Sequence, residues 1–228
     1  MSPTGTVIVS GGASGLGAAI AEAVRDRGAT PHVLDVNPPE TGIEHTIVDL
    51  DDPPLAEKVA AEVAGSVERL DAVVTCAAVD SPGDFADTDG STWDRIVRIN
   101  SMGTAAVIRG ALPRLIESRG KVVTVASTLG LRTLPAATAY SASKFGVVGL
   151  TRALAMELAG KVGVTLLVPG GMRTRFFDGR PEAFKPSPGQ ELNDPANVAE
   201  AVVFALAQPP GCEVREIVIT PSVEPSWP

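Results

Sequence analysis

A glycine-rich segment between a strand-like run and a helix-like run most constrains the fold of this chain. The apolar run Thr6 to Val9 predicts a buried strand, and the alanine-rich stretch that follows Gly17 predicts a helix. Between the two runs, Gly11, Gly15 and Gly17 stand in a Gly-x-x-x-Gly-x-Gly spacing. Glycine lets the backbone approach a phosphate closely, and a helix N-terminus offers unpaired N–H groups and a partial positive charge. The segment predicts a phosphate-binding turn; a glycine-rich turn with no ligand is the alternative.

Strand-like and helix-like runs alternate along the chain. The predicted strands are Thr6 to Val9, His32 to Asp35, Thr46 to Val48, Ala72 to Thr75, Val122 to Ala126, Val164 to Val168 and Glu216 to Thr220. The predicted helices are Gly15 to Arg27, Leu55 to Ala64, Thr92 to Ser118, Ala139 to Ala159 and Asp194 to Ala207, with Pro113 as a break or late kink in the third. This alternation predicts an α/β fold, a Rossmann-like doubly wound parallel sheet of about seven strands with helices on both faces. Ligands of such sheets bind at the carboxyl ends of the strands.

A carboxylate follows the second predicted strand, at the position expected of a ribose ligand. Asp35 lies eighteen residues after Gly17, where it could accept hydrogen bonds from an adenosine ribose. Its charge would repel a 2′-phosphate, and Ser14 rather than an arginine occupies the glycine turn. We therefore expect NAD(H) to be preferred over NADP(H).

Tyr140 and Lys144 form a second pattern with chemical meaning. A spacing of four places both side chains on one face of a helix, so the ammonium can favour the ionised form of the phenol. A phenol, whose pKa is ordinarily about 10, could then exchange protons at neutral pH. Taken alone, such a pair is usually a solvated lysine beside a half-buried tyrosine.

These residues together resemble the short-chain dehydrogenase/reductase family, in its compact single-domain branch, from about Thr6 to Thr220. The family's glycine motif is matched by Ser10, Gly11, Gly15 and Gly17. Its catalytic tetrad is matched by Asn100, Ser127, Tyr140 and Lys144, and its Pro-Gly segment with a later threonine by Pro169, Gly170 and Thr174.

The resemblance implies hydride transfer between an alcohol or carbonyl carbon and C4 of a nicotinamide. Tyr140 would exchange the proton with the substrate oxygen, which Ser127 would also hydrogen-bond. Lys144 would hold the ribose hydroxyls and, with the oxidised nicotinamide, lower the Tyr140 pKa. Asn100 would interrupt its helix and anchor a water that connects Lys144 to solvent.

The resemblance also implies a set of cofactor-binding residues. Asp49 would contact the adenine, unless it is an ordinary turn or cap residue, and Thr174 would lie near the nicotinamide carboxamide. The full set is Gly11, Ser14, Gly15, Leu16, Gly17, Asp35, Asp49, Leu50, Ala77, Tyr140, Lys144, Pro169, Gly170 and Thr174.

The chain departs from the family after the fourth predicted strand. Where the family usually has Asn-Asn-Ala-Gly, this sequence has Thr75, Cys76, Ala77 and Ala78. The change puts hydrogen bonding at the centre of the sheet in doubt. Ala78 in place of glycine implies a conformation that an L-residue tolerates.

The segment 173–193 is rich in Pro, Gly and charge, and by the resemblance it is the substrate lid. Phe176, Phe177 and Phe184 would contact a small alcohol or ketone, or simply pin the loop to the core. Further substrate-side candidates are Phe85, Leu129, Arg132 and Leu134, although Arg132 is expected to be a solvated loop residue. The tail 222–228 could cap a neighbouring subunit's site or fray.

Composition and charge narrow the classes of function. At 228 residues and 44% apolar content, we expect residues 1–228 to form one domain. A net charge of -8 disfavours nucleic acid and anionic membranes as partners. With no apparent signal peptide or membrane span, the expected location is cytoplasmic. Cys76 and Cys212 are expected to be reduced, and His32 and His45 have no neighbours at metal-ligand spacing, so no metal is expected.

Family members commonly assemble through their two long helices, here Thr92 to Ser118 and Ala139 to Ala159. Small residues on these helices would permit close approach of a second subunit; they are Ala105, Ala106, Gly146 and Gly149. This favours a homotetramer first and a homodimer next.

Two other functions stay open. One is a cofactor-binding regulator or scaffold without activity, and the other is an epimerase or dehydratase, although these usually have longer chains.

Overall fold

The computed structural model describes residues 4–227 and is built on a seven-stranded sheet in the order β3-β2-β1-β4-β5-β6-β7. Every pairing between neighbouring strands is parallel. The strands are β1 (Thr6–Ser10), β2 (Thr30–Asp35), β3 (His45–Ile47), β4 (Leu70–Thr75), β5 (Lys121–Val125), β6 (Gly163–Pro169) and β7 (Glu216–Ile219). The predicted doubly wound α/β fold is confirmed, with the strand boundaries moved by one or two residues.

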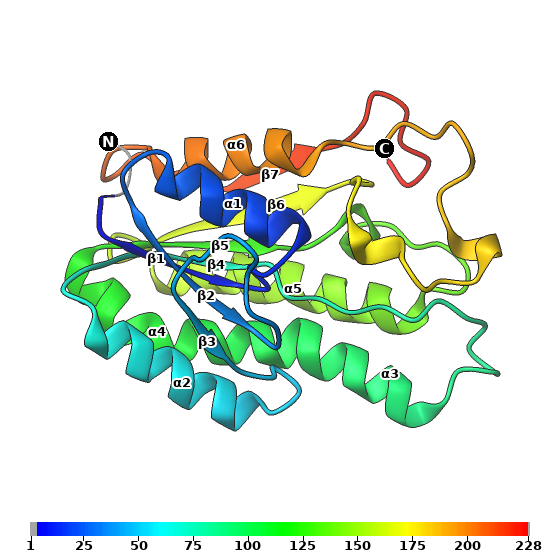
Figure 1. Cartoon of the computed structure of the whole chain (residues 1–228), viewed down its shortest axis with the longest axis horizontal. Helices are drawn as coiled ribbons and strands as arrows, with labels where there is room; N and C mark the ends of the chain where they lie inside the picture. Colours follow the sequence, from blue (N-terminus) through cyan, green and yellow to red (C-terminus); the bar gives the residue numbers. More distant parts are fainter. Residues whose placement is uncertain (1–3, 228) are drawn as a thin grey trace.

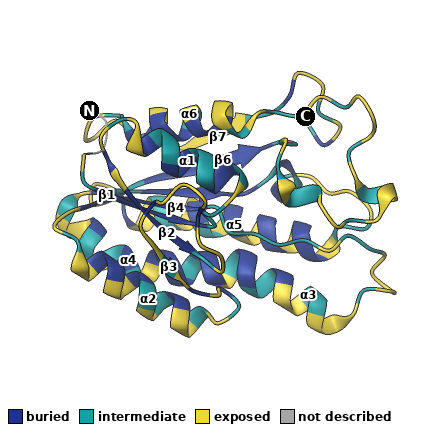
Figure 2. Cartoon of the chain, viewed as in Figure 1, coloured by how far each residue is buried: buried dark blue, intermediate teal, exposed yellow. Residues whose placement is uncertain are grey.

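Helices cover both faces of the sheet (Figure 1). On one face α1 (Gly15–Arg25) packs beside α6 (Pro195–Leu206). On the other face lie α2 (Pro53–Ser66), α3 (Gly90–Val97), α4 (Thr104–Ser118) and α5 (Thr138–Glu157). Separate apolar cores fill the space between the sheet and each helical layer. Figure 2 colours the buried residues of the strands and helices dark blue.

The central strands are buried on both faces, which explains their nearly continuous apolar sequences. All residues of β1 are buried, and the same holds for Ala72 to Thr75 of β4. In a parallel sheet covered by helices, alternation of apolar and polar residues would place polar groups in a core.

The predicted helix Thr92 to Ser118 is interrupted at Asn100, as the resemblance implies, and is therefore not a single regular helix. A π-helical segment, η1 (Arg98–Gly103), separates α3 from α4 and carries Asn100. Pro113 lies inside α4, which continues to Ser118 and ends at Arg119 in the left-handed conformation, with φ of 53°. The interruption falls at the polar Asn100, and Pro113 does not end the helix.

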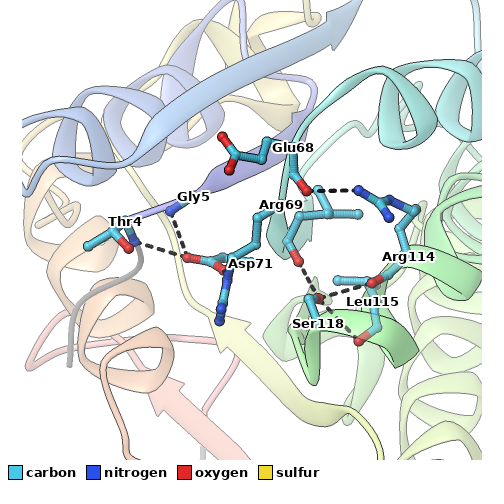
Figure 3. A network of polar contacts seen from close by, with 9 residues as sticks. Thr4, Gly5, Glu68, Arg69, Asp71, Arg114, Leu115 and Ser118 are labelled. Carbon is cyan, nitrogen blue, oxygen red and sulfur yellow. Dashed lines mark hydrogen bonds and ion pairs between the residues drawn. The ribbon is translucent and has the colours of Figure 1, made fainter.

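Polar contacts fix the end of the sheet opposite the carboxyl ends of the strands (Figure 3). The Asp71 carboxylate accepts hydrogen bonds from the backbone N–H groups of Thr4 and Gly5, at 2.9 and 2.8 Å. Arg114 of α4 donates to the carbonyl of Glu68 at 2.9 Å. These contacts hold the starts of β1 and β4 in register while their carboxyl ends remain free to form a site.

The strand order reverses between β1 and β4, because α1 follows β1 on one face and α3 follows β4 on the other. The two connections leave the sheet in opposite directions, so a crevice opens between them at the carboxyl ends of the strands. The candidate site residues lie around this crevice.

Candidate active site

The glycine turn has a shape that only glycine allows at two positions. A Cβ added to Gly17 would lie 2.1 Å from the carbonyl oxygen of Gly11. Gly11 itself has a left-handed φ of 70°, and a Cβ there would lie 2.5 Å from the backbone nitrogen of Ala77. Ser14 precedes α1, and its side chain makes no capping hydrogen bond. The turn thus forms a narrow cradle of backbone at a helix N-terminus, which fits a pyrophosphate.

Asp35 lies directly beside this turn. Its Oδ2 accepts a hydrogen bond from the N–H of Ala13, and its Oδ1 accepts one from the N–H of Asn37, both at 3.0 Å. The end of β2 is thereby tied to the glycine turn, and the binding of one nucleotide by both stays a prediction.

Asp49 and Leu50 border the same cavity beyond β3. Asp49 is exposed, and its Oδ1 accepts a hydrogen bond from the N–H of Asp51 at 2.9 Å, which is a turn-forming contact. Leu50 is buried against Gly103. A Cβ added to Gly103 would lie 2.8 Å from the Cβ of Leu50. Asp49 therefore has a local structural role, whether or not it also contacts an adenine.

Helix α5 presents Tyr140 and Lys144 to the cavity from one face. Both side chains are buried, and the Lys144 Nζ lies 5.6 Å from the centroid of the Tyr140 ring. Lys144 donates a hydrogen bond to the carbonyl of Val125, at the end of β5, at 2.9 Å. Ser127 follows that strand and accepts a hydrogen bond from the N–H of Leu129 at 3.1 Å. The end of β5 and one face of α5 thus bring three of the predicted catalytic side chains together.

The pKa values of these groups are set mainly by burial. Burial raises the pKa of the Tyr140 phenol, and the nearby Asp80 carboxylate raises it further, whereas a hydrogen bond with Ser127 and the charge of Arg180 lower it. Burial lowers the pKa of Lys144 to about 8. Desolvation outweighs the surrounding charges at Tyr140, and the expected lowering of its pKa by Lys144 together with an oxidised nicotinamide stays a prediction.

Asn100 joins three segments around the site. Its Oδ1 accepts a hydrogen bond from the N–H of Val79 at 2.8 Å, and its Nδ2 donates to the carbonyl of Val79 at 2.9 Å and to the Ser143 hydroxyl at 3.0 Å. The side chain is fully buried. Asn100 therefore fixes the segment after β4 against α5, and its predicted water relay to Lys144 stays a prediction.

The unusual segment after β4 keeps its backbone hydrogen bonding. The N–H of Cys76 donates to the carbonyl of Ser10 at 2.9 Å, while the buried Thr75 hydroxyl has no partner among the described residues. Among the described non-glycine residues only Arg119 and Ala136 have a left-handed φ, so Ala78 adopts an ordinary conformation, as expected. Burial raises the pKa of the Cys76 thiol to about 12, against the effect of the Lys144 charge.

The segment 173–193 folds over the cavity and is closed at its base by a bridge between Met172 and Asn193. Within it, Phe176 lies against Tyr140, with ring centroids 5.7 Å apart. Arg180 stacks on Phe176 and Phe177, with its guanidinium carbon 4.7 and 4.8 Å from their ring centroids.

Arg180 also forms an ion pair with Asp80 at 2.7 Å, across the cavity wall. Sequence reasoning missed this pair. The available signal was a charged residue, Asp80, two residues after the altered segment that follows the buried strand.

The C-terminal tail packs against the chain's own site. The Glu224 carboxylate accepts a hydrogen bond from the N–H of Gly171 at 2.8 Å, and the hydroxyls of Ser226 and Thr128 lie 2.7 Å apart. The described part of the tail is therefore not frayed, and a role as a cap on a neighbouring subunit's site stays a prediction. Pro228 lies outside the described residues.

Most of these groups line one cavity of about 580 Å³. Three predicted residues do not line it: Asn100 acts from behind the wall, Phe85 is exposed, and Arg132 lies near the Trp227 ring, 6.0 Å from its centroid. The predicted residues that line it are Gly11, Ser14, Gly15, Leu16, Gly17, Asp35, Asp49, Leu50, Ala77, Ser127, Leu129, Leu134, Tyr140, Lys144, Pro169, Gly170, Thr174, Phe176, Phe177 and Phe184.

Within residues 4–227, no cluster of His, Cys, Asp or Glu could hold a metal ion. No helix in the same part of the chain is both long and apolar enough to cross a membrane.

The parallel sheet and the cavity at its carboxyl edge define a nucleotide-binding α/β protein of the Rossmann type. The sequence model of the short chain dehydrogenase family matches residues 5–183. The chain belongs to the short-chain dehydrogenase/reductase family and is an oxidoreductase by that membership.

Relatives of known sequence agree with this assignment. An uncharacterized oxidoreductase of Staphylococcus aureus (strain MW2) is 30% identical over 94% of this chain and 96% of its own length. The glycine betaine reductase of Emericella nidulans is 29% identical over 96% of this chain, which spans only 19% of that longer protein.

A solved structure of alcohol dehydrogenase from the archaeon Thermococcus sibiricus, complexed with 5-hydroxy-NADP, superposes with a TM-score of 0.82. It is 21% identical and covers 93% of this chain and 94% of its own. At this identity the likeness supports the fold.

Proposed function

We propose that this protein transfers a hydride between a nicotinamide nucleotide, preferably NAD(H), and an alcohol or carbonyl carbon of a small molecule. One observation carries the proposal: a single cavity connects the glycine turn and Asp35 to Tyr140, Ser127 and Lys144. If the glycine turn, Tyr140 and Lys144 had only structural roles, they would not need to line the same cavity. The solved relative that binds 5-hydroxy-NADP supports a nicotinamide nucleotide as the class of cofactor.

In this proposal Tyr140 handles the proton of the reaction. Its raised pKa keeps the phenol protonated at neutral pH, so it can donate a proton to a carbonyl oxygen as that oxygen gains charge. Ser127 holds the same oxygen in place by a hydrogen bond. A bound nicotinamide nucleotide supplies or accepts the hydride. The ammonium of Lys144, which has its pKa at about 8, orients ribose hydroxyls beside the phenol.

The proposed cofactor preference rests on Asp35. Its carboxylate stands next to the glycine turn through the hydrogen bond from Ala13, so a 2′-phosphate at this position would meet a negative charge. No arginine occurs within the turn to offset that charge.

The test of hydride transfer is Tyr140→Phe, which removes the hydroxyl and keeps the ring that contacts Phe176. We expect turnover to fall by about 100- to 10,000-fold, the usual contribution of acid/base catalysis, with NADH affinity unchanged. Transfer of deuterium from deuterated NADH to the carbonyl carbon of a ketone substrate, detected in the alcohol product by mass spectrometry, measures the reaction itself. Undiminished turnover in the variant would contradict the role of Tyr140.

A second candidate is a cofactor-binding regulator or scaffold. The unpartnered Thr75 hydroxyl in the altered segment favours it, because this position no longer carries the family's hydrogen-bonding residue. NADH binding by the wild type, with no deuterium transfer from NADH to any ketone and none from any deuterated alcohol to NAD+, would support this reading.

We further propose that the chain forms a homotetramer or homodimer through α4 and α5. Exposed apolar side chains on and next to these helices support it: Met102, Ile116, Phe145 and Met156. An added Cβ at Gly149 of α5 would meet nothing within 4 Å, so a second helix could approach closely there.

A further inference from the structure

Two aromatic rings, Phe176 and Phe177, form a wall of the cavity beside Tyr140. The centroid of the Phe176 ring lies 5.7 Å from that of the Tyr140 ring, and Phe177 meets Phe176 edge to face, also at 5.7 Å. Both phenylalanines belong to a short 3-10 turn, η3 (Arg175–Phe177), and both line the cavity. A carbonyl oxygen that reaches the Tyr140 hydroxyl therefore places the substituents of its carbon next to this aromatic wall.

Phe176 is held in place from two sides. Its backbone N–H donates a hydrogen bond to the Thr174 hydroxyl at 3.3 Å, and the guanidinium carbon of Arg180 lies 4.7 Å from the centroid of its ring. Arg180 forms an ion pair with Asp80 at 2.7 Å, and the exposed fractions of these two side chains are 13% and 6%. A backbone hydrogen bond from Ser81 also holds the Asp80 carboxylate. The planar guanidinium is thus anchored to the segment after β4 and stacks on Phe176.

The positive charges along the cavity are matched within the protein. Lys144 is buried and donates to the carbonyl of Val125, and Glu224 accepts hydrogen bonds from Gly171 and Ser226. The other lysines and arginines that line the cavity in the described part of the chain each have a carboxylate partner: Arg95 with Asp51 at 3.5 Å, Arg175 with Glu40 at 3.7 Å, Arg180 with Asp80 at 2.7 Å and Lys185 with Glu182 at 2.9 Å. An anionic substituent would therefore find no free cation beside the aromatic wall among these residues.

We propose that the substrate is an uncharged ketone or aldehyde with an aromatic or bulky apolar substituent, which packs on Phe176 while the carbonyl oxygen meets Tyr140. Arg180 and Asp80 are positioning residues, because they act by holding Phe176. The inference rests on the proposed hydride transfer and adds its substrate class. In the direction of reduction, the carbonyl carbon takes the hydride of NADH and the oxygen takes the proton of Tyr140, which solvent replaces. The products are an alcohol and NAD+.

The test compares ketones that differ only by a phenyl ring. The pairs are acetone with phenylacetone and butanone with benzylacetone, and every member reacts as a methyl ketone. For the wild type with NADH we expect kcat/KM to favour the phenyl ketone of each pair by about 10- to 100-fold, the effect of burying an aromatic ring. Benzylacetone with a para-carboxylate or a para-aminomethyl group should be a poorer substrate than benzylacetone, because either charge would lose its hydration beside the aromatic wall.

Phe176→Leu keeps an apolar side chain and removes the ring. We expect the preference for the phenyl ketones to fall by about 2- to 10-fold, the contribution of an aromatic pair beyond its buried area. The ratio of kcat/KM within each pair is measured, because an effect of Phe176 on Tyr140 changes both ketones alike. Phe204→Leu is the matched control and should leave the ratio unchanged, since Phe204 belongs to α6, is 58% exposed and does not line the cavity.

The ion pair is removed as a unit, since the loss of one partner alone would leave an uncompensated buried charge. In Asp80→Leu/Arg180→Met we expect the phenyl preference to fall about as far as in Phe176→Leu. Combining all three substitutions should lower it no further, because substitutions that act through one contact are not additive. Arg27→Met/Glu200→Leu removes an ion pair between the ends of α1 and α6 and is the matched control.

NADH titration of every variant shows whether the nucleotide site is intact. Arg180→Lys keeps a positive charge for Asp80 and removes the planar guanidinium, so it tests the stacking on Phe176 even where the double variant does not fold. It should lower the phenyl preference by part of the loss seen in Phe176→Leu.

Three results would overturn the proposal. One is a wild type that favours acetone and butanone, or either charged benzylacetone, and another is a phenyl preference that Phe176→Leu fully retains. The third is an unchanged ratio in the ion-pair variants, or a ratio that falls further when they are combined with Phe176→Leu, since the pair then does not act through Phe176. Failure of the proposed function looks different: no NADH binding, or no oxidation of NADH by any ketone of the panel.

Discussion

Lys144 shows at the scale of one residue how burial sets the chemistry of the site. Its ammonium is almost fully buried and has one protein acceptor, the carbonyl of Val125. Desolvation therefore lowers its pKa to about 8. With its pKa at about 8, Lys144 is partly deprotonated at slightly alkaline pH, whereas the Tyr140 phenol beside it stays neutral.

Lys144→Met tests this burial through the pH dependence of stability. The unfolded lysine binds its proton more tightly than the folded one, so the wild type carries a cost at neutral pH that is relieved as the pH rises above about 8. Between about pH 7 and about pH 9.5, we expect the free energy of unfolding of the wild type to rise by about 2 kcal/mol relative to the variant. Urea denaturation at several pH values measures it.

The exposed Lys161→Met is the control for that comparison, and its difference from the wild type should not change with pH. A stability difference for Lys144→Met that is flat across the same range would mean that the ammonium is well solvated.

At the scale of elements, sequence patterns predict the sheet and the glycine turn. They do not predict contacts between segments that are distant in the sequence. The apolar runs predicted every strand, because a doubly covered parallel strand has to be apolar, and the glycine spacing located the Gly11 to Gly17 turn. Periodicity could not reveal the π-helical turn at Asn100, whose amide bonds Val79 and Ser143 far along the chain.

The Asp80 and Arg180 pair joins positions one hundred residues apart, so no local signal could match them. The position of the tail likewise depends on the hydrogen bond from the N–H of Gly171 to the Glu224 carboxylate. These two residues follow β6 and β7, and the pairing of the two strands brings them together.

Deleting residues 224–228 tests whether the tail is part of the substrate site. The truncation removes the hydrogen bond from Gly171 to Glu224 and the contact between Ser226 and Thr128. We expect the substrate KM to rise by about tenfold or more, as the loss of two hydrogen bonds allows, with NADH affinity unchanged. Steady-state kinetics and NADH titration separate the two effects.

Glu224→Gln is the conservative partner of that truncation, since it keeps an oxygen that can accept from Gly171. It should show a smaller rise in KM than the truncation. Identical kinetics for the truncated and intact proteins would place the tail outside the functional site.

At the scale of the whole molecule, the outer faces of α4 and α5 are the proposed contact between subunits. Light scattering after size exclusion should give a multiple of the chain mass of 23.4 kDa, with four chains favoured. Phe145→Glu places a charge on α5, where the side chain is 45% exposed, and should shift the protein toward smaller species. Phe85→Glu, on an exposed loop outside α4 and α5, is the control. A monomeric wild type would contradict the proposal.

The central claim is that the cavity at the carboxyl edge of the sheet holds a nicotinamide nucleotide, with Asp35 selecting NAD(H). Titration of NADH and NADPH by nicotinamide fluorescence tests it most directly, on the wild type, Asp35→Arg and Asp35→Asn. The asparagine control keeps an oxygen that can accept from Ala13 and removes only the charge. The account predicts that the wild type binds NADH more tightly, that Asp35→Asn narrows the difference and that Asp35→Arg reverses it. Equal binding of both nucleotides by all three proteins, or binding of neither by the wild type, would contradict it.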